Sequence, residues 1–429
     1  MENTKIKETN SNIKEEVLEI GKRAKQAALT LSTSSNDARN KALKAAAGAI
    51  RKNKNKIQSE NNKDLELAKE KGLKGAMLDR LELNDSRIEA MAKGLEDIAK
   101  LDDPVGKELA RWDRPNGLDI ARVSVPLGVI GIIYESRPNV TADAGALCLK
   151  SGNAAILRGG SESFHSSTAI LESLQEGLKE AGLPESAIQS IPTRDREAVG
   201  EMLKMAQYID VIVPRGGRSL IERVIEDSKI PTFQHLDGNC HSYVHEKADA
   251  KKAVEVVLNA KMRRTGICGA TESLVIDESV AGDILPQIVD ALTSESCEIR
   301  GDEKAISIDS RIKSASNEDW DTEYLDAIIS VKVISGLNDA IDFINLHSSH
   351  HTDAIITEDL GAAEEFLNRV DSAIVMHNAS TQFADGGEFG MGAEIGIATG
   401  RIHARGPVGV EQLTTFKYVV RGNGQTRPK

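Results

Sequence analysis

The sequence predicts an α/β protein with two doubly wound domains, and three observations support that prediction. Apolar residues recur at helical spacing from about Ile13 to Ala99. Short apolar runs and helix-forming segments then alternate between residues 119 and 228, and again between 327 and 376. This alternation is typical of βαβ units, in which helices cover both faces of a parallel sheet. Two such blocks in one chain indicate two domains that face each other across a cleft.

The two blocks divide into expected elements by residue range. In the first block, strands are expected at 119–125, 129–133, 154–157 and 209–213, and helices at 167–181 and 220–228. In the second block, strands are expected at 327–334, 354–356 and 372–376, and helices at 337–345 and 360–370. Residues 1–11 are mostly polar and are predicted to be disordered, because they offer little apolar surface for a core.

The composition is that of a globular protein which does not bind nucleic acid over a wide surface. Of the 429 residues, 40% are hydrophobic and 28% are charged, and the formal net charge is -12. Broad nucleic-acid interfaces need clustered positive charge, so no nucleic-acid partner is expected. No apolar run reaches the roughly 20 residues that span a bilayer, and the polar N-terminus does not resemble a signal peptide. We therefore expect a cytoplasmic protein with a small-molecule substrate and no membrane partner.

Two βα turns are candidates for binding an anionic ligand. Each follows an expected strand, opens an expected helix and contains two glycines, which let the backbone approach a ligand closely. The first turn comprises Arg158, Gly159, Gly160, Ser161 (the expected N-cap) and Glu162, and the second contains Gly216 and Gly217. One such turn alone is more often an ordinary connection. Two turns after consecutive strands are better support, because ligands bind at the carboxyl ends of strands in open α/β sheets. Neither turn has the GxGxxG pattern of the usual dinucleotide site.

Cys268 is the candidate nucleophile. Arg263 and Arg264 precede it, and nearby positive charge increases the thiolate fraction that a nucleophile needs. The flanking glycines, Gly266 and Gly269, leave room for a substrate carbonyl. The composition of this segment alone leaves the alternative of a buried structural cysteine open.

The remaining cysteines and the histidines give no comparable signal. Cys148 lies in an apolar run and is predicted to be structural, whereas Cys240 and Cys297 have no feature that indicates a role. The cysteines form no CxxC pair, and the two HxxxH pairs lie in a strand-like segment and in a turn, where they cannot chelate as on a helix. No metal site is predicted.

Six short motifs resemble the γ-glutamyl phosphate reductase family, a branch of the aldehyde dehydrogenase superfamily. They are YESRPNVT, CLKSGN, LRGGSE, HLDG, GICGA and FGMGAEIGI, and they begin in that order at residues 134, 148, 157, 235, 266 and 389. The resemblance extends from about residue 12 to the C-terminus without large gaps. It implies an aldehyde-dehydrogenase-like fold with a cofactor domain, a catalytic domain and a small oligomerisation element.

The resemblance also implies a domain map and a reaction. The cofactor-binding domain is expected at 12–238, with oligomerisation strands at about 112–128, and the catalytic domain at 239–398. Residues 399–429 are expected to form a C-terminal return and an oligomerisation tail. The implied reaction is NADPH-dependent reduction of L-glutamyl 5-phosphate to L-glutamate 5-semialdehyde and phosphate, in proline biosynthesis. A homo-oligomer and a contact with glutamate 5-kinase are the implied protein partners.

The resemblance assigns roles to individual residues. Cys268 forms a thioester with the substrate, and Asn139 is the amide nearest to the position that stabilises the oxyanion. Arg158 stands where the superfamily has a lysine that contacts the adenosine ribose, and its forked donors suit the 2′-phosphate of NADPH. Glu323 matches the glutamate that holds the nicotinamide ribose. His235 belongs to the cofactor site and replaces the glutamate that activates water in oxidising aldehyde dehydrogenases, so the thioester is not expected to be hydrolysed.

The substrate contacts are less specific in the sequence. Arg137, Lys150 and Arg264 are candidates for binding the anionic groups of the substrate, and each is equally consistent with a solvated charge. Gly269 departs from the asparagine that the resemblance predicts directly after the nucleophile. Two other functions stay open: an aldehyde dehydrogenase that acts on a different carbonyl, and a non-catalytic oligomeric scaffold.

Overall fold

The computed structural model describes residues 2–135, 137–234 and 237–427. The chain forms two compact units, Met1–Gln234 with Met391–Gly396 and Val408–Lys429, and His235–Gly390 with Ile397–Pro407. The main division therefore falls four residues before the boundary at 238 that the sequence predicts. No helix of the described residues is both long and apolar enough to cross a membrane.

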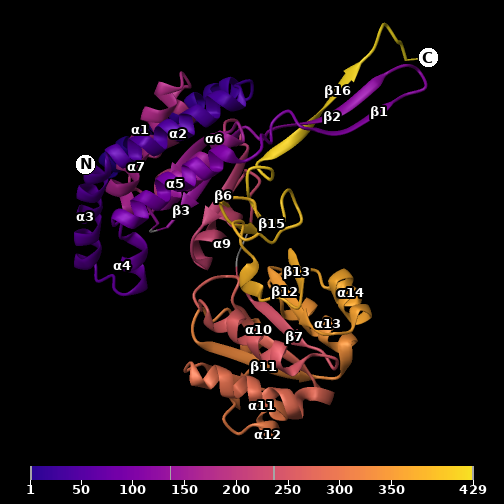
Figure 1. The fold of residues 1–429 in the computed structure, drawn as a ribbon. Helices are drawn as coiled ribbons and strands as arrows, with labels where there is room; N and C mark the ends of the chain where they lie inside the picture. The colour runs from indigo at the N-terminus through magenta and orange to yellow at the C-terminus, as the bar shows by residue number, and fades with distance from the viewer. Residues whose placement is uncertain (1, 136, 235–236, 428–429) are drawn as a thin grey trace. The chain divides into compact units, whose positions relative to one another are not determined.

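The first unit contains the N-terminal helices, a parallel sheet and an arm of antiparallel strands (Figure 1). Its helices are α1 (Glu2–Leu31), α2 (Asn36–Lys52), α3 (Lys54–Glu70), α4 (Ala76–Leu81), α5 (Asp85–Lys100), α6 (Asn139–Lys150), α7 (Phe164–Glu180), α8 (Glu197–Met202) and α9 (Arg218–Asp227). Its strands are β1 (Glu108–Asp113), β2 (Asp119–Pro126), β3 (Val129–Tyr134), β4 (Ala154–Arg158), β5 (Ile188–Ser190), β6 (Val211–Arg215) and β16 (Thr414–Arg421). Short 3₁₀ turns occupy Ser161–Ser163 and Glu185–Ala187.

Within the described part of this unit, four parallel strands pair in the order β5-β4-β3-β6. Strand β3 is central and fully buried, as a continuous run of Val and Ile predicts for a strand covered on both faces. Helices α1, α6 and α7 pack against this sheet. The carboxyl ends of β3, β4 and β6 lie along one edge of the sheet, and the two candidate turns follow β4 and β6 there.

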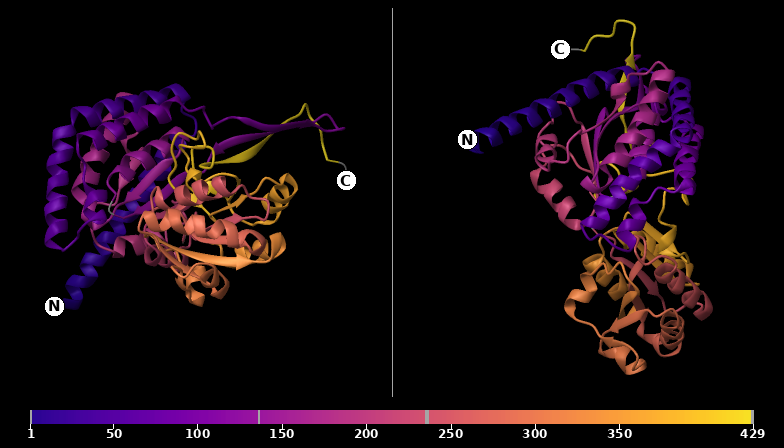
Figure 2. Two further views of the ribbon diagram at one scale, coloured as in Figure 1. Left: turned by 60° about the horizontal axis from the view of Figure 1, so that its bottom comes forward. Right: turned by 90° about the vertical axis from the view of Figure 1, so that its left-hand side faces the viewer.

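The arm consists of β1, β2 and β16, which pair in the order β1-β2-β16 and are antiparallel. It extends away from the helices of its own unit as a long ribbon (Figures 1 and 2). Its strands join residues near 110 to residues near 420, so the oligomerisation strands and tail expected from the sequence form one sheet. The arm carries exposed apolar side chains, namely Leu109, Trp112, Phe416, Tyr418 and Val420.

The second unit is a parallel sheet with helices on its faces. Its helices are α10 (Ala250–Met262), α11 (Glu278–Ser294), α12 (Glu303–Ile308), α13 (Gly336–His347) and α14 (Leu360–Arg369), with 3₁₀ turns at Asn317–Asp321 and Thr381–Phe383. Its strands are β7 (Cys240–Val244), β8 (Thr271–Asp277), β9 (Glu298–Gly301), β10 (Lys313–Ser314), β11 (Ile328–Ile334), β12 (Thr352–Ile356), β13 (Ile374–His377), β14 (Ile397–Ala398) and β15 (Gly406–Pro407). Within residues 237–390, seven parallel strands pair in the order β10-β9-β11-β8-β7-β12-β13.

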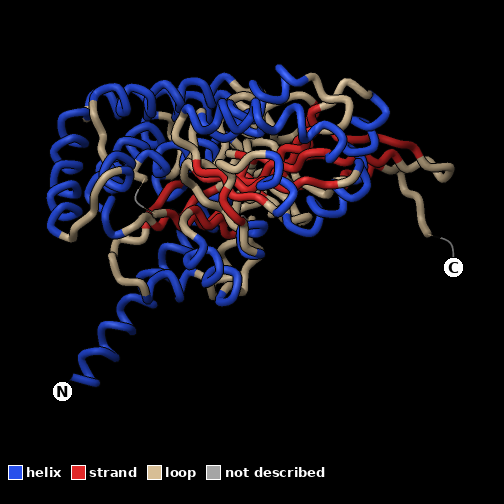
Figure 3. The backbone as a smooth tube through the Cα atoms, turned by 90° about the horizontal axis from the view of Figure 1, so that it is seen from below, coloured by secondary structure: helices blue, strands red, loops and turns tan. Residues whose placement is uncertain are grey.

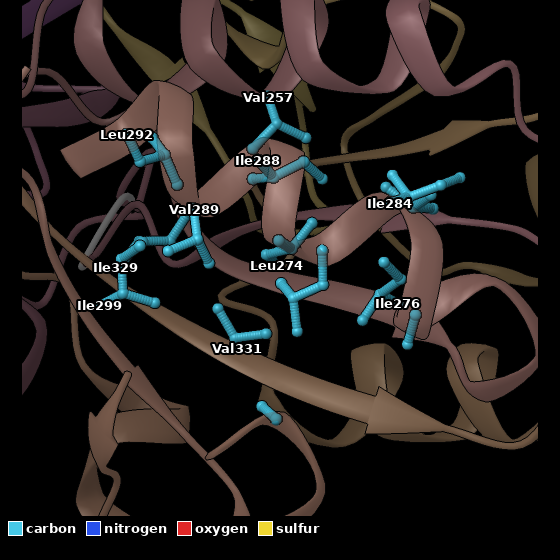
Figure 4. Packing of buried hydrophobic residues seen from close by; sticks show 14 of the residues in the cluster. Val257, Leu274, Ile276, Ile284, Ile288, Val289, Leu292, Ile299, Ile329 and Val331 are labelled. Carbon is cyan, nitrogen blue, oxygen red and sulfur yellow. The ribbon is translucent and has the colours of Figure 1, made fainter. Parts of the chain in front are cut away.

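The core of the second unit is an aliphatic layer between α11 and the middle of the sheet. Side chains of α11, including Ile284, Ile288 and Leu292, pack on Leu274 of β8 and Val331 of β11 (Figure 4). These side chains are almost fully removed from solvent. A packed core therefore holds the C-terminal residues of α10 and the first residues of β8. The loop that joins α10 to β8 thus runs between two fixed ends.

The fold class predicted from the sequence is confirmed, and both domains are doubly wound. Helix α1 begins at Glu2, whereas disorder was expected for residues 1–11; its backbone continues the helix of residues 13–31, which is visible as a long blue rod in Figure 3. Elements between 245 and 308, including α10, β8 and α11, were not among the predicted elements.

Candidate active site

The candidate nucleophile Cys268 lies in the loop that joins α10 to β8. All four cysteines of the chain are among the described residues; the Cys268 side chain is partly exposed, whereas Cys148, Cys240 and Cys297 are buried. Burial raises the pKa of each of those three thiols, to about 11 for Cys297. A thiol that attacks a substrate must be accessible and must ionise, so Cys268 is the cysteine that suits this role.

The backbone of Gly238 lies directly against the backbone of Cys268. A Cβ atom at Gly238 would lie 2.2 Å from the Cys268 carbonyl oxygen and 2.5 Å from the Cys268 Cα, which is closer than atoms can pack. The Cys240 thiol donates to the same carbonyl oxygen, with the sulfur 3.1 Å away. Cys240 therefore supports the backbone of the candidate nucleophile, a contact that its sequence context did not indicate.

Gln382 holds the side of the Cys268 loop. Its amide nitrogen donates to the carbonyl oxygens of Ala260 at 2.8 Å and Arg264 at 3.3 Å. Its amide oxygen accepts a hydrogen bond from the Arg263 guanidinium at 3.2 Å. The loop backbone is fixed by these contacts, while the side chains of Arg263 and Arg264 are exposed.

Glycine at position 269 suits the packing beside the nucleophile. A Cβ atom at Gly269 would lie 3.2 Å from the Thr381 carbonyl oxygen, which is tighter than an ordinary contact. An asparagine at this position would require the segment around Thr381 to move by a few tenths of an ångström. The local backbone therefore accounts for this departure from the family pattern.

Glu323 lies in the same unit and contacts the same backbone. Its carboxylate accepts a hydrogen bond from the Gly238 N–H, and burial raises its pKa above the ordinary range. Since Gly238 also packs on Cys268, the structure brings Glu323 and Cys268 to one place in the second unit. The segment that carries Glu323 joins the 3₁₀ turn Asn317–Asp321 to strand β11.

In the first unit, Arg158 ends strand β4 and is 7% exposed. Its guanidinium donates to the carbonyl oxygen of Gly159, to that of Arg194 at 3.1 Å and to that of Asp195 at 3.4 Å. These bonds tie the loop after β5 to the turn after β4. A Cβ atom at Gly159 would lie 3.1 Å from the Tyr134 ring, so this glycine is needed for packing within the chain.

The prediction that Ser161 is an N-cap is wrong. Gly160 precedes a 3₁₀ turn over Ser161–Ser163, and helix α7 begins only at Phe164. The Ser161 hydroxyl instead donates to the Glu162 carboxylate at 2.9 Å. Because of the 3₁₀ turn, helix α7 begins two residues beyond the start that an N-cap at Ser161 requires, and three residues before the start at 167 that the sequence predicts.

The second turn already contains an anion from the protein itself. The Gly217 N–H, at the start of α9, donates to the Glu135 carboxylate at 2.9 Å. A Cβ atom at Gly216 would lie 2.7 Å from the carboxyl carbon of the same glutamate. Gly216 and Gly217 therefore have a packing role against Glu135, in addition to any contact with a ligand.

Asn139 is the first residue of α6, and its side-chain amide is oriented by a carboxylate one turn later. The amide nitrogen donates to the Asp143 carboxylate at 3.0 Å. Burial raises the pKa of Asp143 to about 6, and the bond from Asn139 opposes that rise. One of the two amide hydrogens is thus engaged by Asp143. Arg137, two residues before Asn139, has an exposed side chain.

Lys150 does not suit its predicted role as a substrate contact. The side chain is fully buried, and its ammonium donates to the Asn36 side-chain oxygen at 2.9 Å, the Asn40 side-chain oxygen at 2.8 Å and the Ala99 carbonyl oxygen at 3.3 Å. An ammonium has three donors, and all three have acceptors within the first unit. Its contacts are structural, because they join α2 and α5 to the end of α6.

We expect Lys150→Met to destabilise the protein by about 2–4 kcal/mol, because buried acceptors lose their donor. Chemical denaturation of the purified protein measures this change. The control is Lys44→Met on the exposed face of α2, which should change the free energy of unfolding by less than about 0.5 kcal/mol. A raised KM for the substrate in a Lys150→Met protein of normal stability would contradict the structural role.

His235 lies outside the described residues, so its predicted place in the cofactor site is stated from the sequence only. Three described residues that support the site were not predicted from the sequence: Gly238, Cys240 and Gln382. The HLDG motif pointed to the neighbourhood of Gly238. Nothing in the sequence around Cys240 or Gln382 indicated their contacts, which depend on pairing between distant segments.

Known proteins are similar to this chain over nearly its whole length. The profile of the "Aldehyde dehydrogenase family" matches residues 1–312. A "Gamma-glutamyl phosphate reductase" of Rhodospirillum rubrum is 64% identical over 420 residues, which are 98% of this chain and 98% of that protein. A protein of the same name from Methylocella silvestris is 58% identical over 429 residues and covers both chains completely.

A solved structure leads to the same family. The crystal structure of a gamma-glutamyl phosphate reductase from Thermotoga maritima is 45% identical and superposes with a TM-score of 0.95. The match covers 96% of this chain and 100% of that structure. Identity at this level over nearly the whole length accompanies a shared fold and a shared arrangement of the chain. The chain therefore belongs to the γ-glutamyl phosphate reductase family, within the aldehyde dehydrogenase family.

Proposed function

We propose that this protein catalyses NADPH-dependent reduction of L-glutamyl 5-phosphate to L-glutamate 5-semialdehyde and phosphate, in proline biosynthesis. The observation that carries the proposal is the Cys268 loop: an accessible thiol on a backbone fixed by Gly238, Cys240 and Gln382. The names of the relatives supply the substrate class. The enzyme is an oxidoreductase of the aldehyde dehydrogenase family.

In this mechanism Cys268 acts as a covalent nucleophile. Its thiolate attacks the acyl carbon of the substrate, the carbon–sulfur bond forms, and the bond from the acyl carbon to the phosphate oxygen breaks. The phosphate leaves with the electron pair of that bond, and a thioester remains on Cys268. A bound nicotinamide cofactor would supply the hydride that reduces this acyl group. The hydride leaves an oxyanion on the former acyl carbon; its collapse breaks the carbon–sulfur bond, releases the aldehyde and restores the thiolate of Cys268.

The oxyanion that forms during attack needs hydrogen-bond donors. We assign this task to backbone N–H groups of the Cys268 loop and to the side-chain amide of Asn139. The bond from Asn139 to Asp143 fixes the amide plane and leaves its second N–H for the substrate. Arg137 and Arg264, both exposed, are proposed to bind the anionic groups of the substrate. The residue at the position of the water-activating glutamate is His235, so the thioester persists until it is reduced.

The residues of the first turn fit a phosphorylated cofactor. The Nε atom of Arg158 is buried and has no hydrogen-bond partner among the described residues, which suits a ligand that brings an acceptor. We propose that Arg158, Gly159, Gly160, Ser161 and Glu162 hold the adenosine end of the cofactor, with Gly216 and Gly217 at the neighbouring turn. Glu323 and His235 are proposed to hold the nicotinamide end.

The sequence assigned the 2′-phosphate of NADPH to Arg158, but both terminal nitrogens of that guanidinium donate to backbone carbonyl oxygens. We therefore propose that the exposed cations Arg194 and Arg196 bind this phosphate. The guanidinium of Arg158 binds the backbone of residues 194 and 195, and this contact places the loop beside the first turn. The Arg194 guanidinium lies over the Phe164 ring, 4.9 Å from the ring centre. This contact holds the guanidinium in place and involves no carboxylate. Forked guanidinium donors suit a phosphate, whereas NADH offers only a hydroxyl group at that position.

We expect the double variant Arg194→Ala, Arg196→Ala to raise the KM for NADPH at least about tenfold, because charge-assisted bonds to the 2′-phosphate are lost. The KM for NADH should stay within about twofold of the wild-type value. Arg80→Ala on α4 is the matched control, since it removes one exposed guanidinium elsewhere in the first unit. Equal changes for both cofactors would show that the pair only stabilises the loop.

We propose that the protein is a homo-oligomer and that the arm forms its interface. The arm carries exposed aromatic and aliphatic side chains. The Tyr418 ring makes edge contacts with Trp112 and with Phe416, with ring centres 6.2 Å and 5.7 Å apart. Exposed clusters of this kind mark interaction surfaces. The contact with glutamate 5-kinase stays a prediction from the resemblance.

The reaction is tested in reverse, with glutamate 5-semialdehyde, NADP and phosphate. We expect NADP reduction that depends on phosphate. Reduction without any need for phosphate would identify a hydrolytic aldehyde dehydrogenase and would overturn the assignment of His235. An absence of turnover in the wild-type protein, with folding confirmed by its melting curve, would favour the non-catalytic scaffold.

A further inference from the structure

A buried ion pair closes the neck of the Cys268 loop. Lys261 lies in the last turn of α10 and Glu272 is the second residue of β8, so the loop 263–270 lies between them. The ammonium of Lys261 donates to Oε2 of Glu272, and both side chains are 0% exposed. The pair therefore joins the two ends of the loop that carries the nucleophile.

The same carboxylate also binds the segment that carries Glu323. Oε1 of Glu272 accepts a hydrogen bond from the Leu325 N–H at 3.3 Å. Leu325 has a φ of 54°, in the left-handed region that a residue with a branched side chain adopts only when its surroundings hold it there. The ammonium of Lys261 also lies 5.8 Å from the centre of the Tyr324 ring. One ion pair thus joins the two ends of the Cys268 loop and contacts residues 324–325, next to Glu323.

Stability alone does not explain a pair of this kind. Removing two charges from water is unfavourable, and apolar residues of similar volume often replace a buried pair without loss of stability. Burial raises the pKa of Glu272 to about 7, and the nearby ammonium opposes that rise. The Glu272 carboxylate nevertheless accepts a hydrogen bond from the Leu325 N–H. An apolar side chain at position 272 would leave this N–H without that acceptor.

We propose that Lys261 and Glu272 are positioning residues, whose ion pair fixes the Cys268 loop and the Glu323 segment relative to each other. The proposal rests on the function proposed above, in which Cys268 receives the acyl group and Glu323 holds the cofactor. Neither Lys261 nor Glu272 needs to contact a ligand for this role. A positioning role and a purely structural role differ in what an apolar replacement does.

The test compares the double variant Lys261→Met, Glu272→Leu with the single variant Glu272→Gln. The double variant fills the same volume without charges, so we expect it to melt no lower than the wild type. It cannot hold the Leu325 N–H, so its kcat should fall at least about tenfold and its Kd for NADPH should rise at least about fivefold. Glu272→Gln retains an oxygen for Leu325; it should melt lower, because Lys261 is left unpaired, but keep its Kd for NADPH within about twofold.

Two results overturn the proposal. One is a double variant with wild-type kcat and wild-type Kd, since the pair would then serve only folding. The other is a Glu272→Gln protein whose Kd for NADPH rises at least about fivefold above the wild-type value. This second result needs no comparison with the double variant, so it decides the matter if the double variant does not fold. NADPH binding is measured by fluorescence and needs no turnover. The Kd values of the variants therefore still test the proposal if the wild-type protein is inactive. Inactivity of the wild type would instead contradict the proposed reaction.

Discussion

Replacing Cys268 with alanine should reduce kcat by at least about a thousandfold, because the remaining groups bind the substrate but form no covalent intermediate. The loop backbone is held by contacts that do not involve the Cys268 sulfur, so the protein should fold normally. The rate is measured as phosphate-dependent NADP reduction, and the melting temperature confirms that the variant is folded.

The matched control for this variant is Cys297→Ala. Cys297 is buried in the core beside α11, where the smaller side chain leaves a small cavity and lowers stability by about 1 kcal/mol. Its kcat should stay within about twofold of the wild type, since no described contact links this sulfur to the Cys268 loop. A Cys268→Ala protein with more than a tenth of wild-type activity would exclude Cys268 as the nucleophile.

Replacing Gly238 with alanine should lower kcat by about a hundredfold while the protein still folds. The added methyl group would occupy the place of the Cys268 carbonyl group, only 2.2 Å from its oxygen, so the backbone of the nucleophile must move. Such overpacking costs about 1–3 kcal/mol of stability. The loss of rate should exceed the loss expected from partial unfolding, and kcat measured well below the melting temperature separates the two.

Gly282→Ala is the control for this second variant. Gly282 lies in α11 of the same unit, and a Cβ atom at that position meets no atom within 4 Å. Because alanine favours a helix over glycine, this change should raise stability by about 0.5–1 kcal/mol and leave kcat unchanged. If Gly238→Ala kept wild-type activity, the close approach of the two backbones would not matter for catalysis.

Much of the fold could be predicted from the sequence, because its pattern is local. The apolar runs at 129–133 and 354–356 correspond to strands β3 and β12, and the helical spacing after Leu337 and Leu360 to α13 and α14. Helix α11 was missed although Ile284, Ile288 and Leu292 recur every four residues. Pro286 at the middle of this helix obscured that spacing, since proline usually ends a helix.

The site could be predicted only where a motif carries it. Cys268 was a candidate from its flanking arginines and glycines and from the family pattern, and Glu323 from the family pattern alone; the structure places both against Gly238. Lys150 was misassigned because charge alone does not show burial, and its acceptors lie 110 and 114 residues away on α2 and 51 residues away on α5. The pair of Lys261 and Glu272 was missed because its two charges meet only after α10 and β8 pack.

The central claim, a thioester on Cys268, is tested most directly by a rapid-mixing experiment without phosphate. Wild-type enzyme is mixed with glutamate 5-semialdehyde and NADP, and NADPH formation is followed by absorbance. We predict a burst of about one NADPH per chain, followed by turnover once phosphate is added, and no burst in Cys268→Ala. Absence of a burst until phosphate is present, or a full burst in Cys268→Ala, would contradict the account.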